Sequence, residues 1–168
     1  MKTFKKNLLR VTFVSLLLLL WVFISSEINS TEKIPAEKDS RMENVEKESI
    51  IRIIEKAYIQ GIHKNQDENA VKKGFHQDFN MLVLQDNAID KVTVDKWLGR
   101  IETMKEDNPE LWNAETTYKL KLIDVASYAA VVILDVYKGK VHFSTDYMLL
   151  YKFEEGWKIV SKIFAVPK

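Results

Sequence analysis

Apolar residues gather in four stretches of the C-terminal half of the chain, a pattern typical of β-strands. Each stretch is rich in branched and aromatic residues, and short turns separate one stretch from the next. This spacing predicts four strands in an antiparallel meander. The predicted strands cover residues 116–125, 128–138, 140–153 and 157–166.

The N-terminal half of the folded region has helical periodicity instead. Apolar residues recur there at three- and four-residue steps, and Gly61 is expected to end the first helix. Thr93 is the predicted N-cap of the last helix, and Pro109 its predicted end. The predicted helices cover 45–61, 67–73 and 94–107, with a short hairpin over 79–92. Helices that precede strands indicate an α+β fold, a curved, cone-shaped antiparallel sheet packed on three N-terminal helices.

The segment from His142 to Phe164 has apolar residues at both odd- and even-numbered positions. A strand with one solvent-exposed face should instead alternate apolar and polar residues. Three helices can cover only one face of the sheet. The other apolar face therefore predicts a partner, most simply a second copy related by two-fold symmetry.

Two-residue turns would fix which side chains share a face. In that register Val131 pairs with Asp146, and Met148 pairs with Ile163. The inner face, toward the helices, is predicted to carry Tyr118, Leu120, Leu122, Val131, Ile133, Asp135, His142, Ser144, Asp146, Met148, Leu150, Trp157, Ile159 and Ile163. The outer face is predicted to carry Val132, Leu134, Phe143, Tyr147, Leu149, Tyr151, Val160, Phe164 and Val166.

The first 26 residues have the pattern of an export signal. Basic residues among the first ten positions precede an uncharged apolar run from Val11 to Ile24. This order predicts either a cleaved signal peptide or a retained membrane anchor. Residues 27–44 are polar and charged and are predicted to be a flexible linker to a domain over 45–168. We expect the protein in the periplasm or cell envelope, with membrane contact only through the N-terminal tract.

The charge balance argues against nucleic acid as a partner. The 168 residues include 25 Lys and Arg against 24 Asp and Glu, without a basic cluster. The absence of cysteine excludes disulfides and thiolate chemistry. His63, His76 and His142 lack the spacing with which one helix or strand holds a metal. The sequence thus predicts neither a metal site nor a cofactor.

Two stretches carry a resemblance to a known family. They are GFHQDFNMLVLQDNAIDKVTVDKWLGRIETMK and AAVVILDVYKGKVHFSTDYMLLYKFEEGWKIVSKIF. Over about Glu46 to Phe164 the chain resembles the putative lumazine-binding proteins of the superfamily named for nuclear transport factor 2. The resemblance implies a cone of curved sheet around three helices, a pocket between them, and dimers through the outer sheet face. Relatives include ketosteroid isomerase, scytalone dehydratase, limonene epoxide hydrolase and polyketide cyclases beside members that only bind, so no single activity is implied.

Asp146 is the main candidate for a functional group. With Ser144 and Met148 on the same face, it would point a carboxyl group into a largely apolar cavity, where it could act as a general base or acid. The alternative is a structural role, in which Asp146 orders nearby backbone or a donor such as Arg100.

Tyr118, Asp135 and His142 form a second polar row across three neighbouring strands of the predicted sheet. A carboxylate between a phenol and an imidazole orients both, so the row could transfer a proton or bind a polar ligand. A solvated cross-strand cluster near the strand ends is the alternative.

Tyr58 on the first helix and Trp97 on the third could stack on a planar ligand, or belong to the plain core. Three functions remain open. The first is an exported, non-catalytic, dimeric domain that binds a small, partly planar molecule through Tyr58, Trp97, Ser144 and Asp146.

The second function is an acid–base enzyme of the isomerase, dehydratase or hydrolase type, with Asp146 as base and His142 or Tyr118 as its partner. The third is a structural or interaction domain whose own side chains fill the cavity.

Overall fold

The structure is a computed structural model that describes residues 36–167. The chain divides into two units, residues 1–40 and 41–168, and the fold and the site belong to the second. The predicted signal peptide or anchor over 1–26, and the linker as far as residue 35, lie outside the described residues. In the described part of the chain, no helix is both long and apolar enough to span a membrane.

A helix occupies residues 36–44, which the sequence assigns to a linker. α2 (Ala36–Ile53) includes this segment. Its Ala, Lys, Glu, Arg and Met residues are good helix formers. Glu43 and Lys47 also form an ion pair one turn apart. From Ser40 to Asn44 the side chains are exposed, so the polar composition there is that of a helix surface in solvent.

The sequence predicts that Gly61 ends the first helix, but the helix continues beyond this residue. η1 (Ile54–Lys64) continues α2 as a π-helix through this glycine. A Cβ atom at Gly61 would lie 2.9 Å from Cγ2 of Val71 in α3 (Glu68–Gly74). The glycine is needed because the two helices pack closely at this point.

Side chains cap the N-termini of the following helices. Asp67 accepts hydrogen bonds from two backbone N–H groups at the start of α3. Thr93 caps α4 (Val94–Asp107), as predicted. Pro109 begins the additional helix α5 (Pro109–Asn113) rather than ending α4. In the first turn of a helix the missing N–H of proline costs no hydrogen bond.

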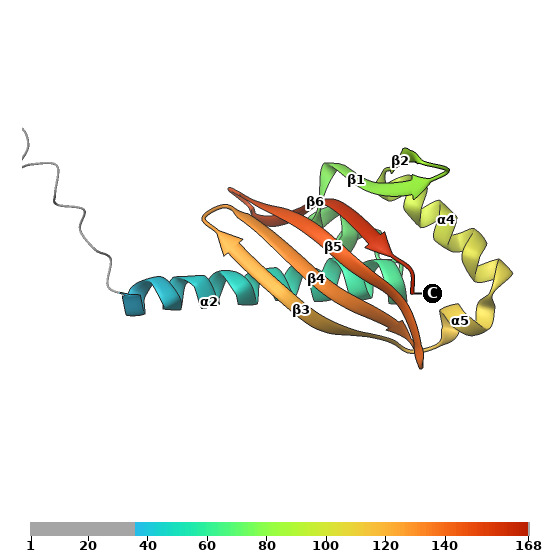
Figure 1. The fold of residues 1–168 in the computed structure, drawn as a ribbon, viewed down its shortest axis with the longest axis horizontal. Coiled ribbons are helices and arrows are strands. Elements are labelled where there is room, and N and C mark those ends of the chain that lie inside the picture. Colours follow the sequence, from blue (N-terminus) through green and yellow to red (C-terminus); the bar gives the residue numbers. More distant parts are fainter. Residues whose placement is uncertain (1–35, 168) are drawn as a thin grey trace, which may run out of the picture. The chain divides into compact units, whose positions relative to one another are not determined.

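Six strands form one curved, mixed sheet in the order β2-β1-β6-β5-β4-β3 (Figure 1). Strands β3 to β6 form the predicted antiparallel meander. The predicted hairpin is present as β1 and β2, but β1 pairs in parallel with β6, so the sheet is not purely antiparallel. The strands are Phe75–Gln85 (β1), Ala88–Val92 (β2), Thr116–Ala126 (β3), Ala129–Lys138 (β4), Val141–Phe153 (β5) and Gly156–Ala165 (β6). The α+β fold class is confirmed.

Bulges change the register of the central strands from the predicted one. The turn between β4 and β5 lies one residue further along, and an extra residue in β5 shifts the pairing again. Asp146 therefore pairs with Leu134 rather than with Val131. The turn between β5 and β6 lies one residue earlier than predicted and a bulge follows it, so Met148 pairs with Lys162 rather than with Ile163.

A shift of one residue moves a side chain to the other face of a sheet. Asp146 and Trp157 lie on the inner face, as predicted, and both are buried against the helices. Other assignments were wrong. The outer face carries Val131, Ile133, Asp135, His142 and Ile163, and the inner face carries Val132, Leu134, Phe143 and Phe164.

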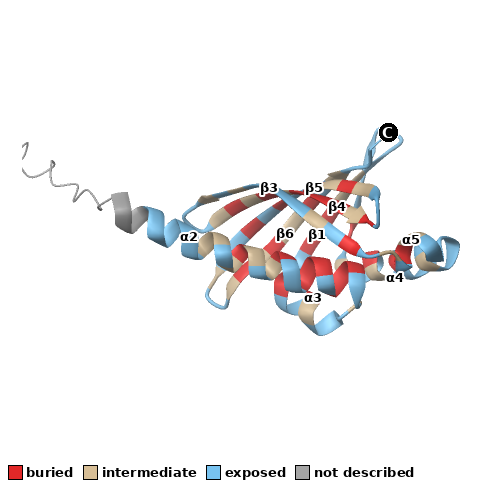
Figure 2. Ribbon diagram, turned by 90° about the horizontal axis from the view of Figure 1, so that it is seen from below, coloured by how far each residue is buried: buried red, intermediate tan, exposed pale blue. Residues whose placement is uncertain are grey.

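The hydrophobic core fills the space between the inner face and the helices, where Figure 2 shows the buried residues. The outer face, in contrast, leaves large apolar side chains in solvent. Tyr147, Leu149, Tyr151 and Ile163 are each between 40% and 53% exposed. No residue of the described range 36–167 covers these side chains, which we call the outer apolar patch, and the predicted dimer stays a prediction.

Candidate functional site

A pocket of about 540 Å³ opens between the inner face of the sheet and helices α4 and α5. Four aromatic rings from four different elements contribute to its wall, and among the described residues no acidic side chain lines it. The rings are those of Trp97 (α4), Trp112 (α5), Phe143 (β5) and Phe164 (β6). Because this volume is open, side chains do not fill the part of the space between sheet and helices that lies next to α4 and α5.

Three buried polar side chains meet at the inner end of the pocket, in contact with one another. The ammonium group of Lys162 donates a 2.8 Å hydrogen bond to the hydroxyl of Tyr58 and lies 3.0 Å from Oδ1 of Asp146. The Tyr58 hydroxyl in turn donates to Oδ2 of Asp146. Lys162 lines the pocket, whereas the other two lie behind it.

Burial sets the protonation of this group. Burial raises the pKa of Tyr58 well above its ordinary value, and the charge of Asp146 adds to the effect, so the phenol stays protonated. Burial lowers the pKa of Lys162, and its ion pair with Asp146 counters part of that change. Each of the three groups thus has a neighbour that compensates for lost hydration, which for Oδ1 of Asp146 is the ion pair with Lys162 alone.

His63 and Ser144 are also buried at the pocket, at 3% and 2% exposure, but they lack such neighbours. Among the described residues, none forms a hydrogen bond with either ring nitrogen of His63 or with Oγ of Ser144. Burial lowers the pKa of His63 well below its ordinary value, and Lys162 and Lys138 lower it further. The ring is therefore neutral near pH 7, with one N–H donor and one acceptor nitrogen.

The π-helical geometry of η1 brings Tyr58 and His63 to the same side. The ring centres lie 4.7 Å apart, although the residues are five positions apart in the chain. In an α-helix, residues at that spacing point about 140° apart. The wider turn of a π-helix, with bonds such as that from Asn65 N to Gln60 O, aligns them. Both side chains consequently reach the pocket region.

A second buried lysine, Lys138, contacts the backbone of His63 and the ring of Trp112. The Lys138 ammonium group donates to the backbone oxygen of His63 at 3.0 Å and to Oγ1 of Thr116 at 2.8 Å. It also lies 4.3 Å from the centre of the Trp112 ring. Burial, followed by the charges of other lysines, lowers the pKa of Lys138 to about 8.

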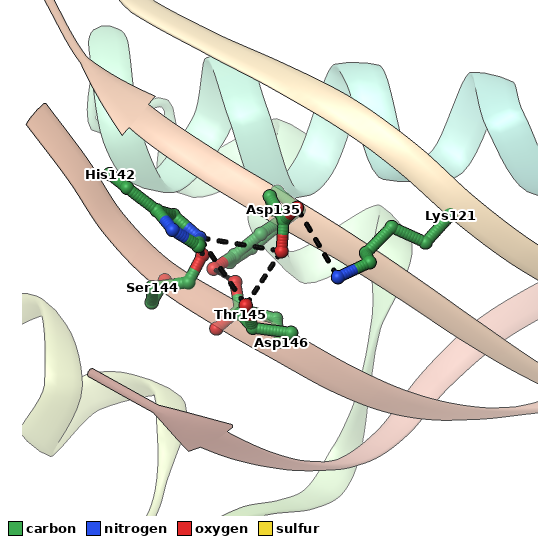
Figure 3. A network of polar contacts seen from close by, with 7 residues as sticks. Lys121, Asp135, His142, Ser144, Thr145 and Asp146 are labelled. Atoms are coloured by element: carbon green, nitrogen blue, oxygen red, sulfur yellow. Dashed lines mark hydrogen bonds and ion pairs between the residues drawn. The ribbon is translucent and has the colours of Figure 1, made fainter. Parts of the chain in front are cut away.

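The second predicted polar row is only partly assembled, and it lies on the outer face. Asp135 accepts a 2.6 Å hydrogen bond from Thr145 and lies 3.3 Å from Nε2 of His142 and 3.5 Å from Nζ of Lys121 (Figure 3). The bond from Thr145, followed by the positive neighbours, lowers the pKa of Asp135. His142 also reaches the rim of the pocket.

Tyr118 does not belong to this row. Its hydroxyl donates to Glu55 on η1 at 2.8 Å, and burial together with that bond raises the pKa of Tyr118 to about 12. In residues 36–167, no three His, Asp or Glu side chains are grouped so as to hold a metal ion.

Comparison with known proteins shows which family the chain belongs to. Residues 46–165 match the family described as "putative lumazine-binding". The chain belongs to this family. The resemblance inferred from the sequence is therefore confirmed, and the matched range includes every residue that lines the pocket except Val166 and Pro167. No curated protein matches the sequence.

Solved structures similar to this putative lumazine-binding family member share its fold. An NTF2-like protein of unknown function from Shewanella baltica is 24% identical, with 73% of this chain and 94% of that one covered and a TM-score of 0.56. One from Silicibacter pomeroyi is 15% identical, with 76% and 98% covered and a TM-score of 0.57. One from Novosphingobium aromaticivorans, with a cystatin-like fold, is 14% identical, with 80% and 91% covered and a TM-score of 0.54. These likenesses show the fold alone.

The structure thus separates the candidates proposed from sequence. Trp97 and Ser144 line the pocket, while Tyr58 and Asp146 support it through Lys162. Asp146 is bound by a lysine and a tyrosine, not by Arg100, which pairs with Asp90.

Sequence reasoning missed Lys162 and His63, which supply polar groups to this family member's pocket. Lys162 and Ser161 stand together between the apolar pairs 159–160 and 163–164 of a predicted strand, and that polar interruption was a readable signal. His63 follows a glycine that suggested the end of a helix, so its position within the helix could not be inferred.

Proposed function

We propose that this domain binds a small, partly planar molecule in the pocket and holds it without converting it. The observation that carries the proposal is the pair of buried side chains without partners, His63 and Ser144, at a largely apolar pocket. A buried polar atom without a hydrogen bond costs about 1–3 kcal/mol. A ligand whose polar edge reaches these side chains would remove that cost.

The shape of the wall supports a planar ligand. Trp97 and Trp112 come from different helices, and Phe143 and Phe164 from neighbouring strands. Flat rings pack on such surfaces with large contact areas and with favourable stacked or edge-on geometries. The volume of about 540 Å³ lies in the range of small-molecule sites.

The family description suggests a class of ligand. Lumazine is a flat bicyclic pteridine whose edge carries both hydrogen-bond donors and acceptors. The neutral ring of His63 offers one donor and one acceptor, and the ammonium group of Lys162 offers further donors. A ligand of this chemistry would match the polar end and the aromatic wall together.

Tryptophan fluorescence tests the proposal, because Trp97 and Trp112 both line the pocket. We expect saturable quenching by lumazine and by planar 2-naphthol, but not by decahydro-2-naphthol, the saturated analogue. Ser144→Ala should weaken lumazine binding about tenfold, the effect of one hydrogen bond. Ser49→Ala, on the exposed surface of α2, is the control. Absence of saturable quenching by every planar compound would refute the proposal.

We also propose that the domain functions outside the cytoplasm. The basic start and the uncharged run from Val11 to Ile24 support this location. Cell fractionation followed by N-terminal sequencing would test it, and recovery of the full chain only from the cytosol would contradict it.

A further inference from the structure

The amine of Lys162 combines features that surface lysines do not have. Among the lysines of the described residues, it alone lines the pocket. Its side chain is 4% exposed, and its nitrogen lies 4.7 Å from the ring centre of Trp97 and 5.2 Å from that of Phe164. Both rings belong to the pocket wall, so a planar molecule stacked there lies beside the amine.

Asp146 restricts the chemistry that this amine can undergo. The carboxylate is 0% exposed and depends on the positive charge at 3.0 Å. Acylation of Lys162 would remove that charge and leave a buried carboxylate without a counter-ion, which is strongly unfavourable. Conversion to a protonated imine keeps both the positive charge and an N–H for Asp146.

We propose that Lys162 forms a reversible imine with a planar aldehyde or ketone that enters the pocket. The inference rests on the proposed binding function and adds the reactive group of the ligand. It makes the protein a covalent but reversible carrier of carbonyl compounds.

The reaction balances with the groups that are present. Asp146 takes a proton from the ammonium group, and the free amine attacks the carbonyl carbon, so that a C–N bond forms. A proton moves from nitrogen to oxygen to give a carbinolamine. Asp146 returns its proton to the hydroxyl group, the C–O bond breaks, and water leaves. The products are a protonated imine, the Asp146 carboxylate and one water molecule.

The surroundings of Lys162 favour the free amine that this reaction needs. Burial lowers the pKa of Lys162, so its amine is released at a lower pH than that of an exposed lysine. Among the described residues, Asp146 pairs with it, and Tyr58 stays protonated because burial raises its pKa. Arg100 lines the same pocket but pairs with Asp90. His63, on the same side, is neutral because burial lowers its pKa.

Reductive trapping on the full chain tests the inference. We would incubate the protein with 2-naphthaldehyde and sodium cyanoborohydride, measure the intact mass, and map the adduct by peptide mass spectrometry. We expect one adduct per chain, on Lys162, at a rate at least tenfold above that of an exposed lysine such as Lys72. Lys162→Arg, which keeps the charge but cannot form the imine, should lose this adduct.

The wild-type map decides the question even if the arginine variant does not fold. Labelling spread over surface lysines, with none enriched at Lys162, would overturn the imine. A parallel titration with 2-naphthylmethanol, which has the same ring but no carbonyl, separates the two proposals. Quenching of tryptophan fluorescence by the alcohol without labelling by the aldehyde would refute the imine alone. If neither occurs and lumazine and 2-naphthol also fail to quench, the proposed binding function fails as well.

Discussion

His63 shows how a single side chain can reveal the use of a cavity. Its ring packs against Tyr58, Trp112 and Phe143, yet among the described residues neither nitrogen has a hydrogen-bond partner. A histidine kept only for packing could be replaced by phenylalanine at no cost in unpaired polar atoms. Its presence is therefore better explained by a partner that enters from the pocket.

The buried ring also predicts how stability depends on pH. Burial holds the pKa of His63 well below 6.5 in the folded state, whereas the unfolded chain titrates at the ordinary value. Below pH 6.5 the unfolded state takes up a proton that the folded state does not, so stability falls as the pH falls. At pH 5 the unfolded-state pKa of about 6.5 limits the loss from this residue to about 2 kcal/mol at most.

Urea denaturation of the wild type and of His63→Phe at pH 7 and pH 5 measures this loss. The carboxylates contribute equally to both proteins, so the difference between them isolates His63. His76→Phe, outside the pocket, serves as the control for the same substitution at another position. An identical pH dependence in the wild type and His63→Phe would show that the ring is not buried in its neutral form.

At the level of elements, the contact between η1 and α3 depends on a glycine. A Cβ atom at Gly74 would lie only 2.1 Å from Cβ of Ala57. We expect Gly74→Ala to destabilise the protein by about 1–3 kcal/mol, because the helices must separate to admit the methyl group. Thermal or urea denaturation would measure the change.

Gly99 provides the matched control. It lies in the interior of α4, and a Cβ atom there would have no neighbour within 4 Å. Gly99→Ala should therefore stabilise the protein by about 0.5–1 kcal/mol, through better helix propensity alone. If both substitutions have the same sign, close packing at Gly74 is not the cause.

The same scale explains what the sequence could and could not predict. Apolar periodicity located the helices and the meander, and the Thr93 cap was legible because its chemistry is local. Face assignments failed in β4, because the pairing there depends on an extra residue in β5 that has no distinctive sequence. The assumption of 3.6 residues per turn likewise concealed the π-helix, and with it the position of His63 beside Tyr58.

The face of a candidate residue was predicted correctly only where the errors in strand register did not affect it. Asp146 and Ser144 were placed on the inner face because both belong to the regular part of β5 after the bulge. Asp135 was placed on the wrong face by the slip in β4. Lys162 was overlooked because a lysine in a strand is ordinarily solvated, and its buried partners come from distant segments.

For the whole molecule, the outer apolar patch supports the proposed dimer. Leu149→Lys should shift a wild-type dimer toward monomer, because it places an unpaired charge in the centre of the apolar contact. Sedimentation velocity would measure the shift. Leu84→Lys, at an exposed position near the end of β1, is the control. A monomeric wild type, or a dimer that Leu149→Lys leaves intact, would refute the proposed assembly.

The parallel pairing of β1 with β6 also has a consequence for synthesis of the protein on the ribosome. β6 is translated after the other five strands and lies between β1 and β5 in the sheet, so it joins the early hairpin to the later meander. Until residues 156–165 have left the exit tunnel, β1 and β5 each lack a neighbour and expose an unpaired edge. Translation that stops before residue 156 would thus leave the two halves of the sheet without the strand that joins them.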